Sequence, residues 1–207
     1  MSKMAKKSID GKDLLDVCVK WQKDKHAEGK GKKVVKVVEK KKKRVVSKVA
    51  TKEAVDRTRK VLEVQSKRLK EYEVFENALR DLLRSELKSA DVQKYQRICS
   101  EITKRFSTLS NAVRKIETAL SSSNKENEEE ETYLRDIVRD IQNMEREKLH
   151  MVARYHLLRL HDKQGSLRPE DKPSIELLAS SIDSCNRDLA LRSADLESFA
   201  NLTCMDS

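Results

Sequence analysis

The stretch VQKYQRICSEITKRFSTLSNAVRKIETAL, residues 92–120, decides the fold, because its apolar residues recur at alternating steps of three and four. These apolar positions are Val92, Tyr95, Cys99, Ile102, Phe106, Leu109, Val113, Ile116 and Leu120. This spacing places them on one narrow face of an α-helix, with mostly polar residues between them. The stretch therefore predicts a helix of about 29 residues, roughly 43 Å long. Such an apolar face must be buried against partner helices.

Three other segments show helical periodicity. Together with the first stretch, at about 91–121, they predict helices at about 51–87, 132–161 and 173–202. Between residues 32 and 164 the chain contains no Gly or Pro, which favours long helices over a sheet with tight turns. Asp91 is the expected N-cap of the second helix, and Glu128–Glu131 is expected to be a solvated charge run leading into the third. The apolar face of the first helix is predicted at Val55, Leu62, Leu69, Tyr72, Phe75, Leu79, Leu82, Leu83 and Leu87.

Matched helix lengths and short connections predict an all-α protein in which long antiparallel helices form a four-helix bundle or packed coiled-coil hairpins. The alternative is an extended coiled-coil arm whose apolar faces another chain completes. We assign residues 1–50 to a basic, largely disordered N-terminal tail and 51–205 to the helical domain.

The excess positive charge belongs to the tail. Residues 1–50 contain 17 Lys and Arg against 6 Asp and Glu, whereas the whole chain has a formal charge of +10. The run Lys40–Arg44 predicts a nuclear import signal first, a phosphate contact second, and plain solvation a close third. The candidate residues for import or nucleic-acid contact are Lys32, Lys33, Lys40, Lys41, Lys42, Lys43 and Arg44.

We find no catalytic or metal-binding pattern in the sequence. His156 and His161 are five residues apart and lie on different helix faces, and no HExxH, CxxC or Gly-rich phosphate loop occurs. Glu145, Glu147 and Lys148 are interpreted as a surface salt-bridge ladder. We therefore expect no enzyme activity, no cofactor and no small-molecule ligand.

The four cysteines are far apart in sequence, which indicates free thiols in a reducing compartment. No apolar run approaches the length of a membrane span, so we expect a soluble protein without membrane association.

A further pattern runs in order through three of the predicted helices, and we interpret it as a helix-surface pattern. Its residues are Gln65, Arg68, Tyr72, Phe75, Tyr95, Thr103, Phe106, Ser110, Glu117, Arg139, Gln142, Glu145 and Lys148. In this pattern, residues 60–160 resemble the DNA-repair family named "required for excision, type B". The resemblance implies a small helical factor needed for nucleotide excision repair, without catalytic residues to carry over.

Two hypotheses follow for the function. The first is a non-enzymatic nuclear repair factor, whose helical bundle docks on a protein partner while the tail contacts DNA or directs import. The second is a coiled-coil adaptor subunit of a cytoskeletal or other large assembly, located in the cytoplasm. The sequence leaves homo-oligomerisation open under either hypothesis.

Overall fold

The computed structural model describes residues 52–120 and 128–202. Within these ranges the chain forms four long helices and no strand: α2 (Lys52–Arg84), α3 (Ser89–Leu120), α4 (Glu128–Lys163) and α5 (Lys172–Leu202). A short 3-10 helix, η3 (Pro169–Asp171), precedes α5. The predicted tail, with its basic run Lys40–Arg44, lies outside the described residues.

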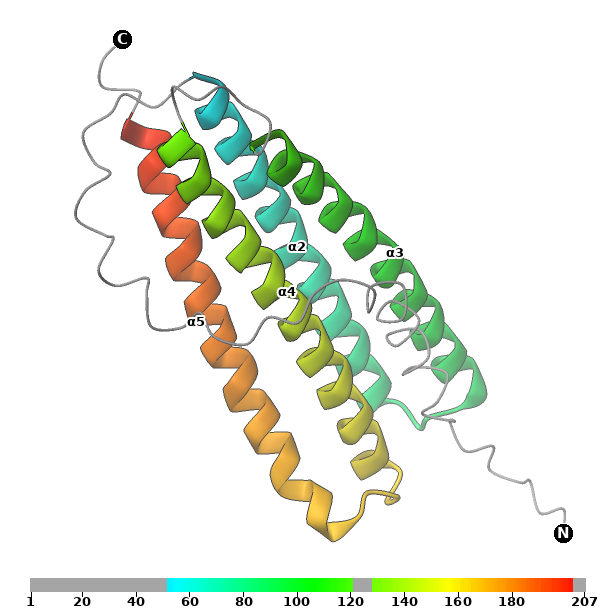
Figure 1. The fold of residues 1–207 in the computed structure, drawn as a ribbon. Helices are drawn as coiled ribbons and strands as arrows, with labels where there is room; N and C mark the ends of the chain where they lie inside the picture. Colours follow the sequence, from blue (N-terminus) through cyan, green and yellow to red (C-terminus); the bar gives the residue numbers. More distant parts are fainter. Residues whose placement is uncertain (1–51, 121–127, 203–207) are drawn as a thin grey trace, which may run out of the picture.

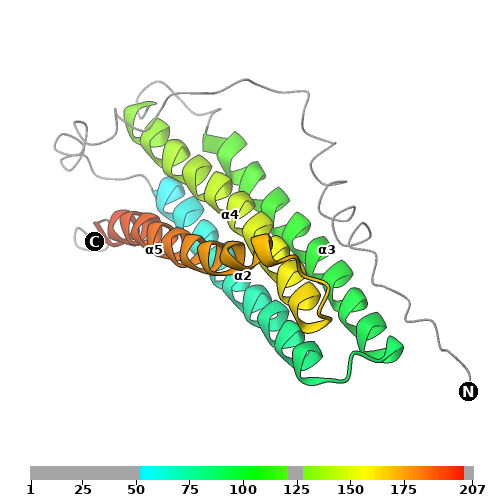
Figure 2. The ribbon, with the colours of Figure 1, turned by 90° about the horizontal axis from the view of Figure 1, so that it is seen from below.

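The four helices alternate in direction and pack side by side as an up-down-up-down bundle (Figure 1). Helix α2 packs mainly on α3 and α4 mainly on α5, so the bundle consists of two helical hairpins. Figure 2 shows that α5 is inclined to the other helices. The predicted four-helix bundle is confirmed, and the helices complete one another's apolar faces within a single chain.

The ends of the helices differ from the prediction by a few residues. Helix α2 ends at Arg84 rather than near Leu87, and Leu87 lies beyond the helix in a left-handed backbone conformation with φ 55°. Helix α3 begins at Ser89, two residues before the expected cap at Asp91. After α4, Gly165 has φ 68°, and Ser166 N donates to His161 O over 2.9 Å, which closes the C-terminus of that helix.

The acidic run before the third helix is part of it. Helix α4 begins at Glu128, and Glu130 and Glu131 are buried rather than solvated. Arg57 of α2 reaches Glu131 with an Nη1–Oε1 distance of 3.4 Å. The expectation of a solvated charge run is therefore wrong at these two residues, because both side chains are buried and Glu131 pairs with Arg57 of α2.

The buried face of α2 also differs from the predicted one. Its buried residues follow alternating steps of three and four through Ala54, Thr58, Val61, Gln65, Arg68, Tyr72, Phe75, Leu79 and Leu82. Leu69, predicted on this face, is 59% exposed. The prediction failed there because it assigned apolar residues to the core and left out the polar residues that share the same helical face.

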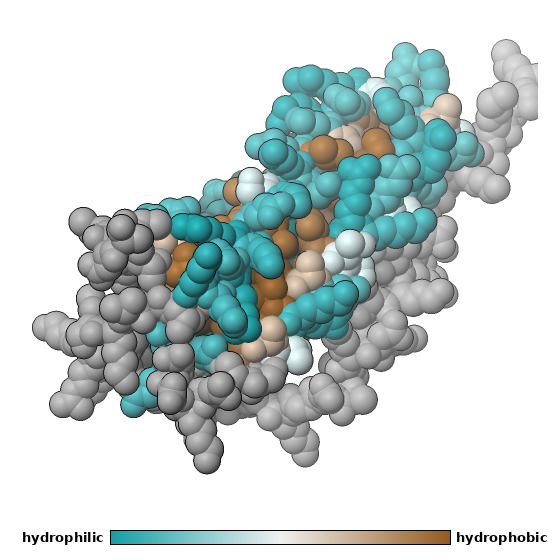
Figure 3. Space-filling model, turned by 90° about the horizontal axis from the view of Figure 1, so that it is seen from above, coloured by the Kyte–Doolittle hydropathy of each residue, from teal (hydrophilic) through white to brown (hydrophobic). Residues whose placement is uncertain are grey.

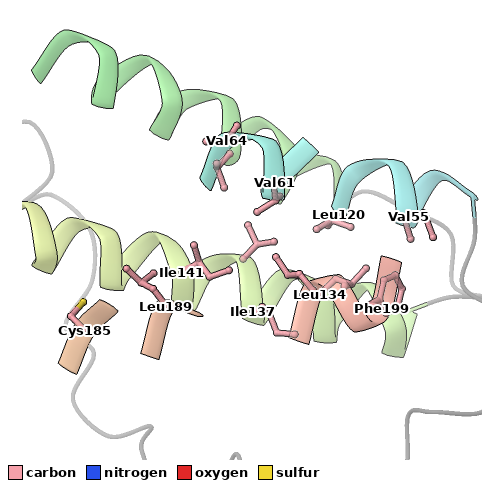
Figure 4. Packing of buried hydrophobic residues seen from close by; sticks show 14 residues of the cluster. Val55, Val61, Val64, Leu120, Leu134, Ile137, Ile141, Cys185, Leu189 and Phe199 are labelled. Atoms are coloured by element: carbon pink, nitrogen blue, oxygen red, sulfur yellow. The ribbon is translucent and has the colours of Figure 1, made fainter. Parts of the chain in front are cut away.

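Two apolar clusters fill the bundle. The first cluster, near the start of α2 and the end of α5, contains Val61, Leu120, Leu134 and Phe199 among others (Figure 4). The second, near the opposite end, is built around Tyr72, Phe75, Tyr95 and Phe106.

Hydrophilic residues cover most of the described surface in the space-filling view, with hydrophobic residues showing between them (Figure 3). None of the helices in the described ranges has the length and hydropathy needed to cross a membrane.

Candidate functional site

A layer of buried polar side chains lies between the two apolar clusters, with Arg68 of α2 at its centre. Arg68 is 1% exposed. Its Nη1 donates to Gln65 Oε1 over 2.7 Å, and its Nη2 donates to Ser110 Oγ of α3 over 3.1 Å and to Gln142 Oε1 of α4. Gln142 Nε2 in turn donates to Ser110 O over 3.0 Å. One guanidinium thus joins three helices.

The same layer continues through Glu145 of α4. Its Oε1 accepts from Gln65 Nε2 over 3.0 Å, and its Oε2 accepts from Tyr72 OH over 3.2 Å. Lys148 Nζ lies 3.7 Å from the centre of the Tyr72 ring, a cation–π contact. Burial raises the pKa of Tyr72 well above its ordinary value, and burial lowers the pKa of Lys148, an effect that Glu145 opposes.

A histidine connects the second apolar cluster to the surface. His156 is 1% exposed, its ring centre is 4.2 Å from that of Phe75, and its Nε2 lies 3.1 Å from Glu76 Oε1. Since an ionised carboxylate only accepts, Nε2–H donates to Glu76, and Nδ1 forms a hydrogen bond of 2.8 Å with Tyr95 OH. The hydrogen bond from His156 is the main cause of the lowered pKa of Glu76.

The buried charge of Arg68 is held by neutral acceptors. No described carboxylate lies within ion-pair distance of its guanidinium, and its Nε has no hydrogen-bond partner among the described residues. Burial is the largest influence on its pKa and lowers it, while the nearby Glu145 raises it. Because burying an unpaired charge is costly, this arginine is an unusual core residue.

Two surface cavities border the polar layer. A pocket of about 190 Å³ between α3 and α4 is lined by Ser110, Arg114, Glu117, Arg139, Gln142, Asn143 and Arg146. A larger groove of about 630 Å³ lies between α2, α4 and α5, with Tyr72, Glu145 and Lys148 among its lining residues. Since Arg68 bonds to residues of both cavities, the polar layer connects them through the bundle.

Most residues of the sequence pattern belong to this layer or pack against it. Gln65, Arg68, Glu145 and Lys148 are buried, so the interpretation of the pattern as a helix-surface pattern is wrong for these residues. Tyr72 is buried, as its place on the predicted apolar face of the first helix indicated. The predicted surface ladder is also wrong: of its three members, Glu147 is exposed, while Glu145 and Lys148 are buried beside the groove between α2, α4 and α5.

The remaining pattern residues lie in three places. The aromatic residues Phe75, Tyr95 and Phe106 are in the second apolar cluster, as their helical spacing predicted. Arg139 Nε donates to Glu117 Oε1 over 2.8 Å at the α3/α4 pocket. Thr103 bonds only locally in the described structure, through Oγ1 to Cys99 O over 2.8 Å.

Sequence reasoning did not identify the polar layer, although the sequence contains a signal for it. Thr58, Gln65 and Arg68 occupy the same three-four spacing as the apolar residues of α2. Polar residues on a core face are a sign of buried hydrogen bonding. The basic candidates Lys32, Lys33, Lys40, Lys41, Lys42, Lys43 and Arg44 lie outside the described residues.

A family model described as DNA repair REX1-B matches residues 56–159, half of the chain. The chain belongs to the DNA repair REX1-B family. The region of the REX1-B model covers most of α2, all of α3 and most of α4, and therefore includes every residue of the polar layer; α5 follows it. Searches of curated proteins and of solved structures gave no match. In the described part of the REX1-B chain, no group of three His, Cys, Asp or Glu side chains is arranged to hold a metal ion.

Proposed function

We propose that this protein is a non-enzymatic accessory factor in nucleotide excision repair, acting in the nucleus. The bundle docks on a protein partner, and the basic tail contacts DNA or directs nuclear import. The observation that carries this proposal is the REX1-B family match, which covers three packed helices and their shared polar layer.

The hydrogen bonding and burial of the ionisable residues in the polar layer support a scaffolding role rather than a catalytic one. A general acid or base must reach a substrate, whereas both oxygens of Glu145 accept hydrogen bonds from Gln65 and Tyr72 inside the bundle. Lys148 is 4% exposed and lies against an aromatic ring. These groups stabilise the packing of the helices, so we assign them a structural role.

The repair role is tested in cells that lack the protein. Removal of ultraviolet photoproducts should be slow in such cells and should recover when the full chain is expressed again. A second rescue uses a chain in which the seven basic candidates of residues 32–44 are replaced by Gln. Normal removal in cells without the protein would refute the proposal.

The tail's contact with DNA is tested by fluorescence anisotropy on an intact and a damaged duplex across a range of salt. If the tail neutralises about five phosphates, log affinity should fall with log salt at a slope near −4.5. The Gln-substituted tail should bind weakly and with a much smaller slope. Equal binding by both chains would show that the tail does not provide the DNA contact.

A further inference from the structure

The α3/α4 pocket carries an excess of positive charge. Its described lining contains three guanidinium groups, from Arg114, Arg139 and Arg146, and one carboxylate, from Glu117. The carboxylate is already paired with Arg139. Arg114 and Arg146 donate to the side-chain oxygens of the neutral residues Asn111 and Asn143. Two arginine charges at the pocket are therefore not balanced by its carboxylate.

A third unbalanced charge lies behind the floor of the pocket. Arg68 donates to Ser110 Oγ and Gln142 Oε1, and both of these residues line the pocket. Arg68 is fully buried, forms no ion pair with the described residues, and has an unpartnered Nε. Glu145 acts on it through space, but that carboxylate accepts from Gln65 and Tyr72. An anion in the pocket would supply the negative charge that this arginine lacks.

The volume and the lining of the pocket suit a phosphate group. Its volume of about 190 Å³ exceeds the roughly 150 Å³ that accommodates a benzene molecule. Arg139 and Arg146 are exposed, so a ligand can enter from solvent. Guanidinium groups match the oxygens of phosphate in pairs, and the Ser110 hydroxyl can donate to another oxygen. We propose that the α3/α4 pocket binds a phosphate group and, resting on the repair role proposed above, that a phosphate of the DNA backbone occupies it.

The first test titrates the full-length protein with inorganic phosphate and follows the side-chain amide resonance of Gln142 by NMR. A saturable shift is expected. The variant carrying R114Q and R146Q should bind phosphate at least about tenfold more weakly, because it loses two charge-assisted hydrogen-bond donors. The matched control carries R97Q and R154Q, which remove the same charge from exposed positions of α3 and α4 outside the pocket, and should bind as wild type does.

The second test measures binding of the same three full-length proteins to a DNA duplex across a range of salt. Loss of one phosphate contact should reduce the magnitude of the slope of log affinity against log salt by about 0.9 in the pocket variant only. A pocket variant that loses phosphate binding but keeps the wild-type slope would confirm the phosphate pocket and overturn DNA as its source.

The whole inference is overturned if phosphate gives no saturable shift, or if the control variant weakens phosphate binding as much as the pocket variant does. Thermal unfolding of both variants should match wild type, since the substituted side chains lie at the surface. The repair role fails through a different measurement. If cells without the protein remove photoproducts normally, the repair role is refuted, but the phosphate titration is still expected to show a saturable shift.

Discussion

Phe106→Ala tests whether the second apolar cluster holds the bundle together. Phe106 is 3% exposed and lies in the middle of α3. Its ring centre is 4.7 Å from that of Tyr72, the residue whose hydroxyl donates to Glu145 in the polar layer. Truncating this side chain therefore removes apolar packing and one support of the polar network.

The expected cost follows from the burial of this ring. Transfer of a buried Phe side chain to water costs about 1.5–3 kcal/mol, and the cavity left by truncation raises the loss to about 3–5 kcal/mol. The lost aromatic pair with Tyr72 contributes within that range. For a protein of this length, such a loss corresponds to a fall in Tm of roughly 6–20 °C.

Urea unfolding followed by circular dichroism measures the change in free energy, and a thermal scan gives Tm. Leu69→Ala is the matched control: Leu69 was predicted in the core from sequence but is 59% exposed, so its truncation should change stability by less than about 0.5 kcal/mol. A loss below about 1 kcal/mol for Phe106→Ala, or an equal loss for both variants, would refute the assignment of this core.

Arg68→Met should lower the free energy of unfolding by about 1–3 kcal/mol. The cost of leaving its buried acceptors unpaired exceeds the gain from no longer burying a charge; a variant more stable in urea would contradict this. The hydrogen bond from the buried His156 is the main reason that the pKa of Glu76 in the folded protein lies below its ordinary value of 4.5. The ionised Glu76 therefore stabilises the fold fully above pH 4.5, and this stabilisation is lost as pH falls through the lowered pKa. The free energy of unfolding of Glu76→Gln should therefore be lower than that of wild type at pH 7, and the two should converge in acid. Glu73→Gln changes an exposed position of the same helix, so its free energy of unfolding should follow that of wild type throughout. Burial raises the pKa of the Cys185 thiol, and Cys99 is also buried. Peptide mapping after iodoacetamide treatment should therefore find both cysteines alkylated much more slowly in the folded protein than in urea, and equal rates would show that these helices open readily.

The sequence by itself determined the helices and the apolar positions of α3. A three-four spacing is a local property of the chain, so Tyr95, Cys99, Ile102, Phe106 and Val113 could be assigned to the core without a structure, and all are buried. The absence of Gly and Pro between residues 32 and 164 predicted long helices there, and the structure confirms three of them, α2, α3 and α4.

Only the tertiary structure decided which polar residues are buried. Arg68 is 42 residues from Ser110 and 74 from Gln142, and its burial depends on acceptors that those helices bring to it. Charged side chains are normally assigned to the surface, and Glu145 and Lys148 were misplaced because their spacing on one helix was interpreted as a surface salt-bridge ladder. The α3/α4 pocket likewise exists only because two helices bring their arginines together, since the charge of each helix alone does not indicate where an anion would bind.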